Sequence, residues 1–413
     1  MSRHILQPDR PPAIVLGRSI SSLGVVRSLA LQGIRSILVS GSKFDPTQKS
    51  RFVLAAHFLE SHGDEEIMGV LDQYRGSRHV IIAVSDIFVA FLSRHEKELR
   101  RDFDFIVPPK QVVSTVIDKA LETEKIETLG FPLPKTVRSL PGDPSAVLTA
   151  LTVPVIVKPR TDAFRHAIGR KNLLVRTRDE LDRFYALYGG ELVNFLAQEV
   201  IPGGDDKMWV CNCTFDWQHN LLNAFTFNRL GTTPAHYGVT SFAISRKNEE
   251  IVEHVRRLGK ALGYRGPAMF EFKYDDRDQS HKYIELNPRL GMCNFFDTLC
   301  GINNVLATYE LSQSRVLACN PILNDFKGRV QRDNIVYIDL FRDAAARLQD
   351  HEELRRIMLR YLKFGRHEKA RPLWWIRDPA PTAYAALRFG MNEASALFRK
   401  FGQRPGKAGA CGR

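Results

Sequence analysis

The chain has 413 residues, 44% of them hydrophobic and 10% aromatic, so it can bury a large core and is longer than most single domains. Its net charge of +13 lies mainly in residues 351–413, which contain 14 Lys and Arg and 5 Asp and Glu. Because no zinc-finger, helix-turn-helix or aromatic RNA-binding signature accompanies this charge, nucleic acid is not an expected partner. The apolar runs are too short to span a membrane and the first residues lack a signal peptide's apolar segment, so we expect a cytoplasmic protein. The six cysteines lack CxxC or zinc spacing, so we expect neither structural disulfides nor zinc.

The first part of the chain alternates strand and helix patterns. Residues 13–16 form an apolar run of strand length, residues 17–30 begin with GRSISSLG and continue as a helical pattern, and residues 36–40 form a second strand. The glycine spacing departs from GxGxxG and no acidic residue ends the second strand, so a dinucleotide site is not expected. The free amides at the start of this helix suit a carboxylate or a phosphate, and a tight turn with an N-cap serine explains the pattern equally well.

Another strand and a longer helical pattern complete this part. The strand at 79–84 ends in Ser85-Asp86. Ligands in open α/β sheets bind at the carboxyl ends of strands, so Asp86 is either a residue at the edge of a site or a helix cap. One helix is predicted from Ser114 to Leu129, followed by GFPLPKT, whose prolines predict an extended linker. We expect a domain boundary just before this helix.

The second half is rich in strand patterns. Val153–Val157 is a compact apolar strand that ends at Lys158, and a lysine at the end of a buried strand needs an anionic partner. Further strands are predicted at 172–176, 193–201, 211–215 and 221–227, and a helix at 248–262.

Residues 268–289, AMFEFKYDDRDQSHKYIELNPR, predict a β-hairpin with a polar loop. If the loop is centred on Asp278, Glu271 lies opposite Glu285. In the same register four polar residues share one face of the hairpin: Glu271, Lys273, Glu285 and Asn287. The other opposed pairs are Met269 with Asn287, Phe272 with Ile284, and Lys273 with Tyr283.

Two carboxylates directly opposite each other repel unless something neutralises them. Glu271, Glu285 and the amide oxygen of Asn287 are oxygen ligands on a rigid strand pair, which suits Mg²⁺, with Mn²⁺ as an alternative. Arg289 then stands as a cation beside any bound phosphate. The other interpretation is that Lys273 pairs with one of the glutamates on an exposed surface.

Taken in chain order, several segments resemble the ATP-grasp superfamily, in particular carboxylate-amine ligases related to carbamoyl-phosphate synthase and D-aspartate ligase. They are Asp118-Lys119, GFPLP, VPVIVKP, QEVIPGGDD, RGPAMFEFKYD and YIELNPR. The resemblance runs from Ala13 to Leu317. It implies an α/β protein with an N-terminal parallel α/β (pre-ATP-grasp) domain, residues 1–113, followed by a two-subdomain α+β ATP-grasp domain, residues 114–330. The ATP-grasp domain would consist of a lid-side part, residues 114–200, and a metal-binding part, residues 201–330.

The resemblance also assigns roles to residues. It implies that Lys119 and Lys158 contact ATP phosphates, and that the hinge residues Gln198, Glu199 and Ile201 meet the adenine edge. Asp205 or Asp206 would hold the ribose hydroxyls, and Glu271, Glu285 and Asn287 would bind magnesium. Arg289 and Lys273 would be the catalytic cations.

Two segments depart from the family pattern. The loop after Lys158, PRTDAFRHAIGR, is not glycine-rich, and Arg160, Arg165, Arg170 and Lys171 substitute for the glycines by charge. In FNRLGTTPAHYG, residues 227–238, relatives often carry a second basic residue where Gly231 stands here.

The implied activity is that of an ATP-dependent ligase for small molecules. A carboxylate would attack the γ-phosphorus of ATP to give an acyl phosphate and ADP, and an amine would then displace the phosphate. The alternatives are a bicarbonate-using, carboxylase-like enzyme, a catalytically silent ATP-binding module, and a nicotinamide dehydrogenase.

Residues 331–413 form a basic C-terminal region that is predicted to be helical. Pro381 opens a helix with an apolar stripe at Tyr384, Leu387, Met391, Ala394 and Phe398. We expect this stripe to dock onto the body of the protein, with contact to an anionic membrane surface as the alternative. Residues 403–413 are small, polar and glycine-rich, which is typical of a mobile tail.

Overall fold

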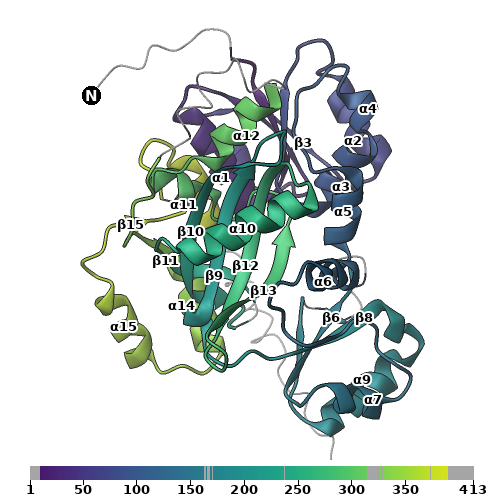
Figure 1. Cartoon of the computed structure of the whole chain (residues 1–413). Coiled ribbons are helices and arrows are strands. Elements are labelled where there is room, and N and C mark those ends of the chain that lie inside the picture. The colour runs from purple at the N-terminus through teal and green to yellow at the C-terminus, as the bar shows by residue number, and fades with distance from the viewer. Residues whose placement is uncertain are drawn as a thin grey trace, which may run out of the picture.

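The computed structural model describes residues 10–161, 164, 168–169, 171–236, 238–313, 326, 329–372 and 374–388, and for Phe341 it describes the backbone alone. Three sheets organise these residues: a four-stranded parallel sheet, a four-stranded antiparallel sheet and a seven-stranded sheet. Figure 1 shows the small antiparallel sheet set apart at the lower right, next to the large central sheet. This arrangement confirms the predicted α/β fold class.

The N-terminal sheet is parallel and has the strand order β3-β2-β1-β4. Its elements are β1 (Ala13–Gly17), α1 (Ser19–Ala30), β2 (Ser36–Ser40), η1 (Pro46–Lys49), β3 (Val53–Phe58), α2 (Asp64–Asp72), β4 (Val80–Ala83), α3 (Asp86–Arg94) and α4 (Glu96–Leu99). Ala13 and Val15 join one apolar cluster, and Ile14 and Leu16 join the cluster on the opposite face. Both faces of β1 are covered, which explains why the strand is a continuous apolar run.

The single helix predicted from Ser114 to Leu129 is wrong. Two helices are present, α5 (Lys110–Ile117) and α6 (Lys119–Thr128). Asp118 between them has an extended backbone, and its side chain accepts hydrogen bonds from the backbone amides of Ala120 and Leu121. This N-cap begins a new helix at Lys119, so that lysine stands on the first turn of α6.

The lid sheet has the order β5-β8-β6-β7 and is antiparallel. Its elements are β5 (Thr136–Val137), α7 (Pro144–Ala150), β6 (Val155–Pro159), β7 (Leu173–Val175), α9 (Arg178–Tyr188), η3 (Gly189–Asn194) and β8 (Phe195–Glu199). Val147 of α7 and Phe184 of α9 share an apolar cluster with Val155 and Val157 of β6. The lid therefore has a core of its own.

The seven-stranded sheet has the order β13-β12-β9-β10-β11-β14-β15. Its elements are η4 (Asp205–Lys207), β9 (Met208–Phe215), β10 (Leu221–Thr233), β11 (Val239–Ser245), α10 (Glu249–Leu262), β12 (Gly266–Asp275), β13 (Ser280–Asn287), α11 (Asn294–Leu299), α12 (Asn304–Gln313), β14 (Val336–Ile338) and β15 (Lys369–Ala370). Helix α10 packs on one face (Figure 1). Helices α11 and α12 contact α1 of the N-terminal domain and join it to the large sheet.

The predicted hairpin forms, with one change of register. Glu271 lies opposite Glu285 and Met269 opposite Asn287, as the alternation predicts. A bulge after Glu271 then pairs Phe272 with Tyr283, so the predicted pairs Phe272–Ile284 and Lys273–Tyr283 are wrong. Because an extra residue on one strand shifts the facing side chains, Tyr283 takes the buried position expected for Ile284.

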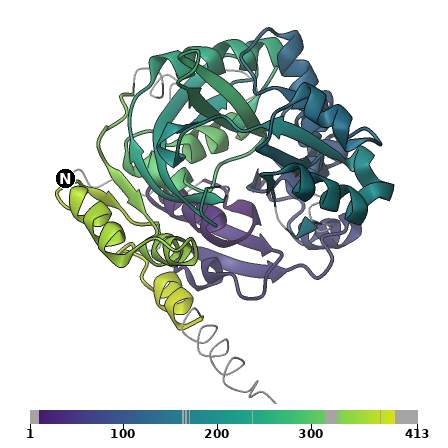
Figure 2. The same cartoon turned by 90° about the horizontal axis from the view of Figure 1, so that it is seen from below.

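The C-terminal region contains the strands β14 and β15 besides the helices α14 (Leu340–Gln349) and α15 (Leu354–Lys363), so it is not purely helical. Residues 380–388 are helical, and the segment before them packs on the N-terminal domain. The ring of Trp375 lies 5.7 Å from that of Phe52 and 5.5 Å from that of Phe295. Figure 2 shows this yellow-green part beside the purple N-terminal elements.

The start of the C-terminal helix contacts the N-terminal domain, since Pro381 is buried and Lys49 lies over the ring of Tyr384, but Leu387 of the predicted stripe is 67% exposed. Met391, Ala394, Phe398 and the tail at 403–413 lie outside the described residues. Among the described helices, none is long and apolar enough to cross a membrane. Cys211, Cys213, Cys293 and Cys300 are buried free thiols, and Cys319 and Cys411 lie outside the described residues.

A buried ion pair ties the C-terminal segment to helix α1. Arg27 Nε lies 3.2 Å from Asp378 Oδ2, and both side chains are almost fully buried. The same carboxylate accepts hydrogen bonds from Ser50 Oγ and the backbone amide of Arg51. Asp378 therefore holds three parts of the chain together.

We expect the Asp378→Ala variant to lose about 3 kcal/mol of unfolding free energy, because it leaves the Arg27 guanidinium buried without its counter-charge. The measurement is the midpoint of urea unfolding. The control is Arg377→Ala, which changes an exposed neighbour and should leave the midpoint in place. Equal midpoints for all three proteins would mean that the ion pair adds nothing to stability.

A buried acid supports the junction between the large sheet and its helices. Asp297 of α11 is fully buried and accepts hydrogen bonds from Asn212 Nδ2 of β9, at 2.9 Å, and Asn304 Nδ2 of α12, at 3.0 Å. Burial raises the pKa of this carboxyl to about 8. Both amides donate to it, so the acid stays in place despite its lost hydration.

The raised pKa predicts a pH dependence of stability. Between the unfolded pKa near 4 and the folded pKa near 8, the native state keeps a proton that the unfolded state releases, so stability falls as pH rises through this window. The Asp297→Asn variant mimics the protonated acid, so its unfolding free energy should lack this part of the dependence on pH. Urea unfolding of both proteins at pH 5 to 8 measures it, and parallel curves would contradict the prediction.

Candidate active site

Two lysines from different elements meet the same glutamate where the lid sheet faces the hairpin. Lys119 Nζ, on the first turn of α6, lies 3.2 Å from Glu285 Oε2. Lys171 Nζ, just before β7, lies 2.5 Å from Glu285 Oε1. Glu285 is only 6% exposed. Burial opposes its charge, but Lys171 and Lys119 overcome this and hold the pKa of the carboxyl well below its ordinary value.

Lys158 is the third cation around this carboxylate. It stands near the end of β6, is buried, and donates a hydrogen bond of 2.6 Å to Gln198 Oε1 of β8. Burial lowers the pKa of Lys158 to about 8, although Glu285 favours its charged form. Two lysines thus contact Glu285 and a third lies near enough to favour its charge, and this excess of positive charge favours an anion such as a polyphosphate.

The opposing carboxylate has a partner that the sequence did not indicate. Glu271, 7% exposed, accepts two hydrogen bonds from Arg229 of β10, at 3.1 and 2.9 Å. Burial disfavours the charge of Arg229, but Glu271 raises its pKa above the ordinary value. The available signal was weak: Arg229 lies within a strand pattern, and an arginine that becomes buried in a strand requires a carboxylate.

The alternative pairing of Lys273 with a glutamate on an exposed surface is wrong, since both glutamates are buried and bind other cations. Lys273 Nζ instead donates to the carbonyl of Gly203, at 2.8 Å. Burial lowers the pKa of Lys273, while Asp205 and Asp206 favour its charge. Lys273 therefore lies beside the loop that follows the hinge.

Arg289 lies at the junction with the N-terminal domain. Its Nε donates to Asp86 Oδ1, at 2.9 Å, and its second guanidinium nitrogen donates to Asn287 Oδ1, at 3.0 Å. Asp86 is the first residue of α3 and follows β4, so the carboxyl end of the parallel sheet does reach this site. Asn287 Nδ2 in turn lies 3.3 Å from Glu285 Oε1.

The hinge residues are held by other protein groups. Gln198 bonds Lys158 and Thr136, and Ile201 is buried. Glu199 accepts a hydrogen bond from the backbone amide of Lys135 and forms an ion pair with Arg277. Its carboxylate therefore aligns the chain at the hinge.

The remaining predicted nucleotide residues differ in their surroundings. Arg160 forms a two-bonded ion pair with Asp118, and its carbonyl accepts the backbone N–H of Lys119, so it fixes the start of α6. Asp205 and Asp206 form η4 next to Lys273, and Asp206 is exposed. Arg165 and Arg170 lie outside the described residues.

A buried glutamate behind the lysines was missed. Glu122 of α6 accepts hydrogen bonds from Tyr283 Oη, at 2.5 Å, and from the backbone amide of Leu286, at 2.7 Å. Burial raises the pKa of Glu122 to about 7. Its position three residues after Lys119, on the same helix face, was the available signal. Through these two hydrogen bonds, Glu122 fixes the position of β13, the strand that contains Glu285.

The hairpin offers oxygen ligands for a divalent cation. Glu271, Glu285 and Asn287 provide two carboxylates and one amide oxygen on adjacent strands. In the described part of the chain, the hairpin included, no group of three or more His, Cys, Asp and Glu side chains is arranged to hold a metal ion, and the hairpin supplies two such side chains and an amide. Magnesium completes its shell with phosphate and water, so a set of two carboxylates and an amide fits it.

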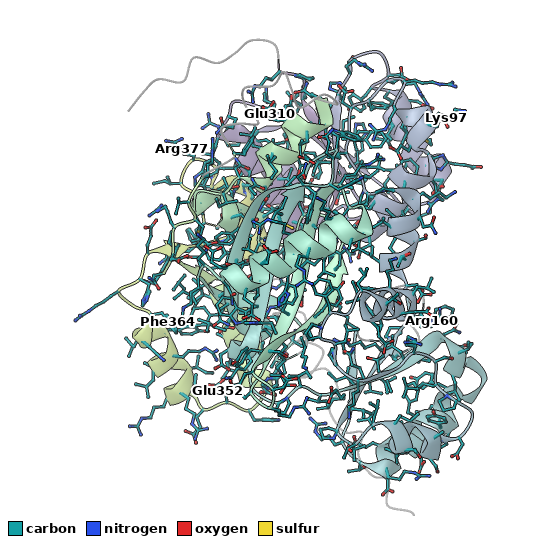
Figure 3. The ribbon with its side chains drawn as sticks, in the orientation of Figure 1. Lys97, Arg160, Glu310, Glu352, Phe364 and Arg377 are labelled. Carbon is teal, nitrogen blue, oxygen red and sulfur yellow. The ribbon has the colours of Figure 1, made fainter. Side chains whose placement is uncertain are left out.

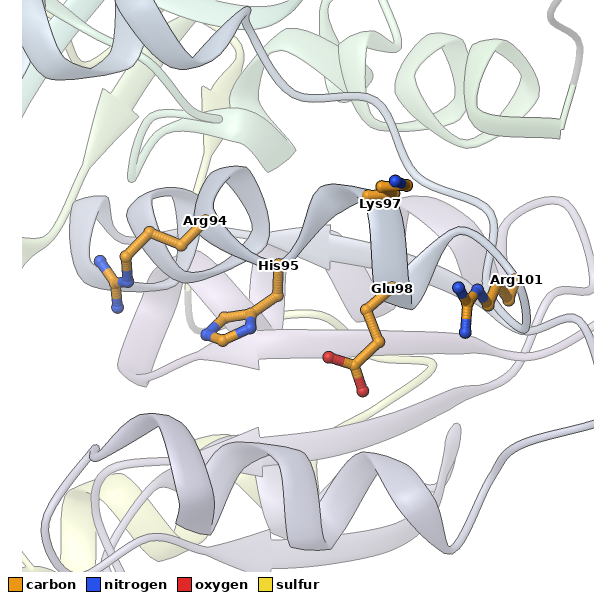
Figure 4. Close-up of a pocket in the computed structure, with 5 residues that line it drawn as sticks. All are labelled: Arg94, His95, Lys97, Glu98 and Arg101. Carbon is orange, nitrogen blue, oxygen red and sulfur yellow. The ribbon is translucent and has the colours of Figure 1, made fainter.

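A surface depression on the N-terminal domain is distinct from this site. It has a volume of about 440 Å³ and is lined by Arg94, His95, Lys97, Glu98 and Arg101 (Figure 4). Arg94 and His95 bind Asp64, and Glu98 binds Arg75. Figure 3 shows Lys97 at the far end of the molecule from Arg160 beside the lid.

Comparisons with known proteins bear on this geometry. No family model matches the chain. The D-aspartate ligase of Enterococcus faecium is 29% identical over 244 residues, which cover 55% of this chain and 57% of that protein. The match therefore spans less than two thirds of that relative.

Solved structures resemble this chain over most of its length. The biotin carboxylase domain of Hydrogenobacter thermophilus 2-oxoglutarate carboxylase, a complex with MgADP, ADP and bicarbonate, has a TM-score of 0.59 at 17% identity and covers 79% of this chain and 74% of that one. The L-amino acid ligase of Bacillus licheniformis has a TM-score of 0.53 at 16% identity and covers 78% and 76%. The chain thus has the ATP-grasp fold, as its ordered motifs predicted.

Proposed function

We propose that this ATP-grasp chain is an ATP-dependent, ADP-forming ligase that activates a small carboxylate as an acyl phosphate and couples it to an amine. The observation that carries the proposal is the cluster of cations at Glu285, which Lys119 and Lys171 contact and whose charge the nearby Lys158 favours, opposite Glu271. The similarity to D-aspartate ligase and to L-amino acid ligase supports carbon-nitrogen bond formation. The proposed location is the cytoplasm.

The lysines would bind the phosphates of ATP. Lys119 and Lys171 now hold the charge of Glu285, and a polyphosphate would share these cations. The pKa of Lys158 near 8 means that an approaching anion favours its protonated form. The three side chains come from α6, β6 and the start of β7, so phosphate binding would draw the lid toward the hairpin.

Glu271, Glu285 and Asn287 would hold magnesium, with manganese as an alternative. The ion supplies neutralisation of the phosphate charge during transfer. Arg229 keeps the carboxylate of Glu271 oriented on the strand. Arg289, held between Asp86 and Asn287, would stabilise the transferred phosphoryl group.

The nucleotide would lie along the hinge. Gln198, Glu199 and Ile201 would face the adenine through their backbone groups, because their side chains are buried or bound to other residues. Asp205 or Asp206 would bind the ribose, and Lys273 would remain close to them. Arg160 would act indirectly, through Asp118 and the start of α6.

A second candidate is supported by the likeness to the biotin carboxylase domain, whose structure contains bicarbonate. A bicarbonate-using enzyme would employ the same lysines and carboxylates with a different acceptor. ADP release with bicarbonate alone, compared with a panel of amino acids and amines, separates the two. Release that depends on bicarbonate alone would favour the second candidate.

We expect Glu285→Gln to abolish magnesium-dependent ADP formation, because it removes one anionic ligand and the partner of two lysines at constant volume. Turnover is measured with a coupled ADP assay, and the melting temperature checks the fold. Glu253→Gln, an exposed residue of α10, is the control. Undiminished turnover in Glu285→Gln would remove the metal assignment.

We expect Lys158→Ala to weaken ATP binding at least tenfold and adenosine binding little, because a lysine aimed at phosphates contributes little to the base. Calorimetry with both ligands measures the difference. Lys260→Ala, at the exposed end of α10, should change neither affinity. Equal losses for ATP and adenosine would show that Lys158 supports the lid only.

A further inference from the structure

An arginine from the C-terminal region fills the space over Gly231. A Cβ atom added at Gly231 would lie 2.4 Å from a terminal nitrogen of Arg347 and 2.6 Å from Asp343 Oδ1. Only glycine leaves room for the guanidinium. A cation thus stands at this point of β10, but α14 supplies it rather than the strand itself.

The local backbone is shaped to receive this arginine. The pairing of β10 with β11 shifts on both sides of Gly231, which places Leu230 in a bulge. The carbonyl of Leu230 accepts hydrogen bonds from Arg347, at 3.3 Å, and from Arg360 of α15. The bulge frees a carbonyl from the ladder, and two arginines use it.

Arg347 is 6% exposed and lies among three carboxylates. One guanidinium nitrogen is 3.6 Å from Asp205 Oδ2 and 3.8 Å from Asp343 Oδ1, and the other is 3.6 Å from Glu352 Oε2. Asp343 is fully buried and accepts hydrogen bonds from Ser241 Oγ and Tyr361 Oη. This network fixes the guanidinium before any ligand arrives.

Asp205 is the member of this group that the proposed function assigns to the ribose. Its side chain is 9% exposed, and Oδ2 is buried next to Arg347 without a hydrogen bond. Its other oxygen, Oδ1, lies 3.5 Å from His236 Nδ1. Asp206 next to it is exposed, and no ion pair to its side chain occurs among the described residues.

We propose that Arg347 is a positioning residue for nucleotide selectivity. It holds Oδ2 of Asp205 by charge, so that Oδ1 is directed to accept a hydrogen bond from a ribose hydroxyl. A preoriented carboxylate binds a hydroxyl without losing rotamer freedom, whereas the exposed Asp206 must lose it. The inference rests on the proposed ATP-dependent function and makes the C-terminal region part of the nucleotide site.

The experiment compares ATP with 2′-deoxyATP in the full-length protein. The wild type should prefer ATP. Arg347→Met and Asp205→Asn should each raise the KM and Kd for ATP about tenfold, with smaller changes in kcat and in the affinity for 2′-deoxyATP. Arg347→Lys, which keeps the charge, should recover part of the preference. The double variant should be no worse than either single variant, because both act through one contact.

Two further variants separate a local effect from a general one. Arg342→Met changes a more exposed arginine of the same helix and should leave the preference for ATP intact. Gly231→Ala should reduce it as Arg347→Met does, since the added methyl group displaces the guanidinium. Melting temperatures identify any variant that fails to fold, and Asp205→Asn tests the idea while leaving every residue of the C-terminal region unchanged.

The outcomes are distinct. Loss of the ATP preference in Asp206→Asn, with none in Asp205→Asn, would overturn the inference. A wild type that forms ADP equally well from both nucleotides would also overturn it and leave the ligase proposal standing. A wild type that binds neither nucleotide would contradict the proposed function itself.

Discussion

The charge of Glu285 is the constraint on which the rest of the site depends. A carboxylate removed from water requires cations close by, and here Lys119 and Lys171 reach it from two different elements. Lys119 can do so because Asp118 breaks the chain into two helices and caps the second. Lys171 can do so only when the lid sheet lies next to the hairpin. One buried charge thus relates the N-terminal helices, the lid and the large sheet.

The hairpin's second carboxylate is balanced within the large sheet itself. Glu271 is held by Arg229, two strands away, so the two facing glutamates have separate sets of cations. Repulsion between them is therefore reduced from both sides before any ligand binds. Glu122 adds a hydrogen bond to the outer edge of β13 and keeps the strand in register next to α6.

The C-terminal region is part of the body of the protein. Asp378 forms a buried ion pair with Arg27 of α1, and Arg347 lies against the loop that follows the hinge. The described part of the C-terminal region therefore contacts both the N-terminal domain and the large sheet. Part of the positive charge of this region, that of Arg347, is balanced by carboxylates of the protein itself. For this reason its basic composition did not identify an external binding partner.

The alternation of side chains in the sequence was sufficient to predict the hairpin and the opposition of Glu271 and Glu285, and short apolar runs indicated β1, β2 and β4, because both patterns are local. The remaining strand of the parallel sheet, β3, was not predicted. The bulge after Glu271, the break at Asp118 and the partner of Lys273 depend on packing between distant segments, so only the tertiary structure decided them. The same holds for Arg229 and Arg347. A charged residue in a strand or helix indicates that a counter-charge exists, but the fold determines which one it meets.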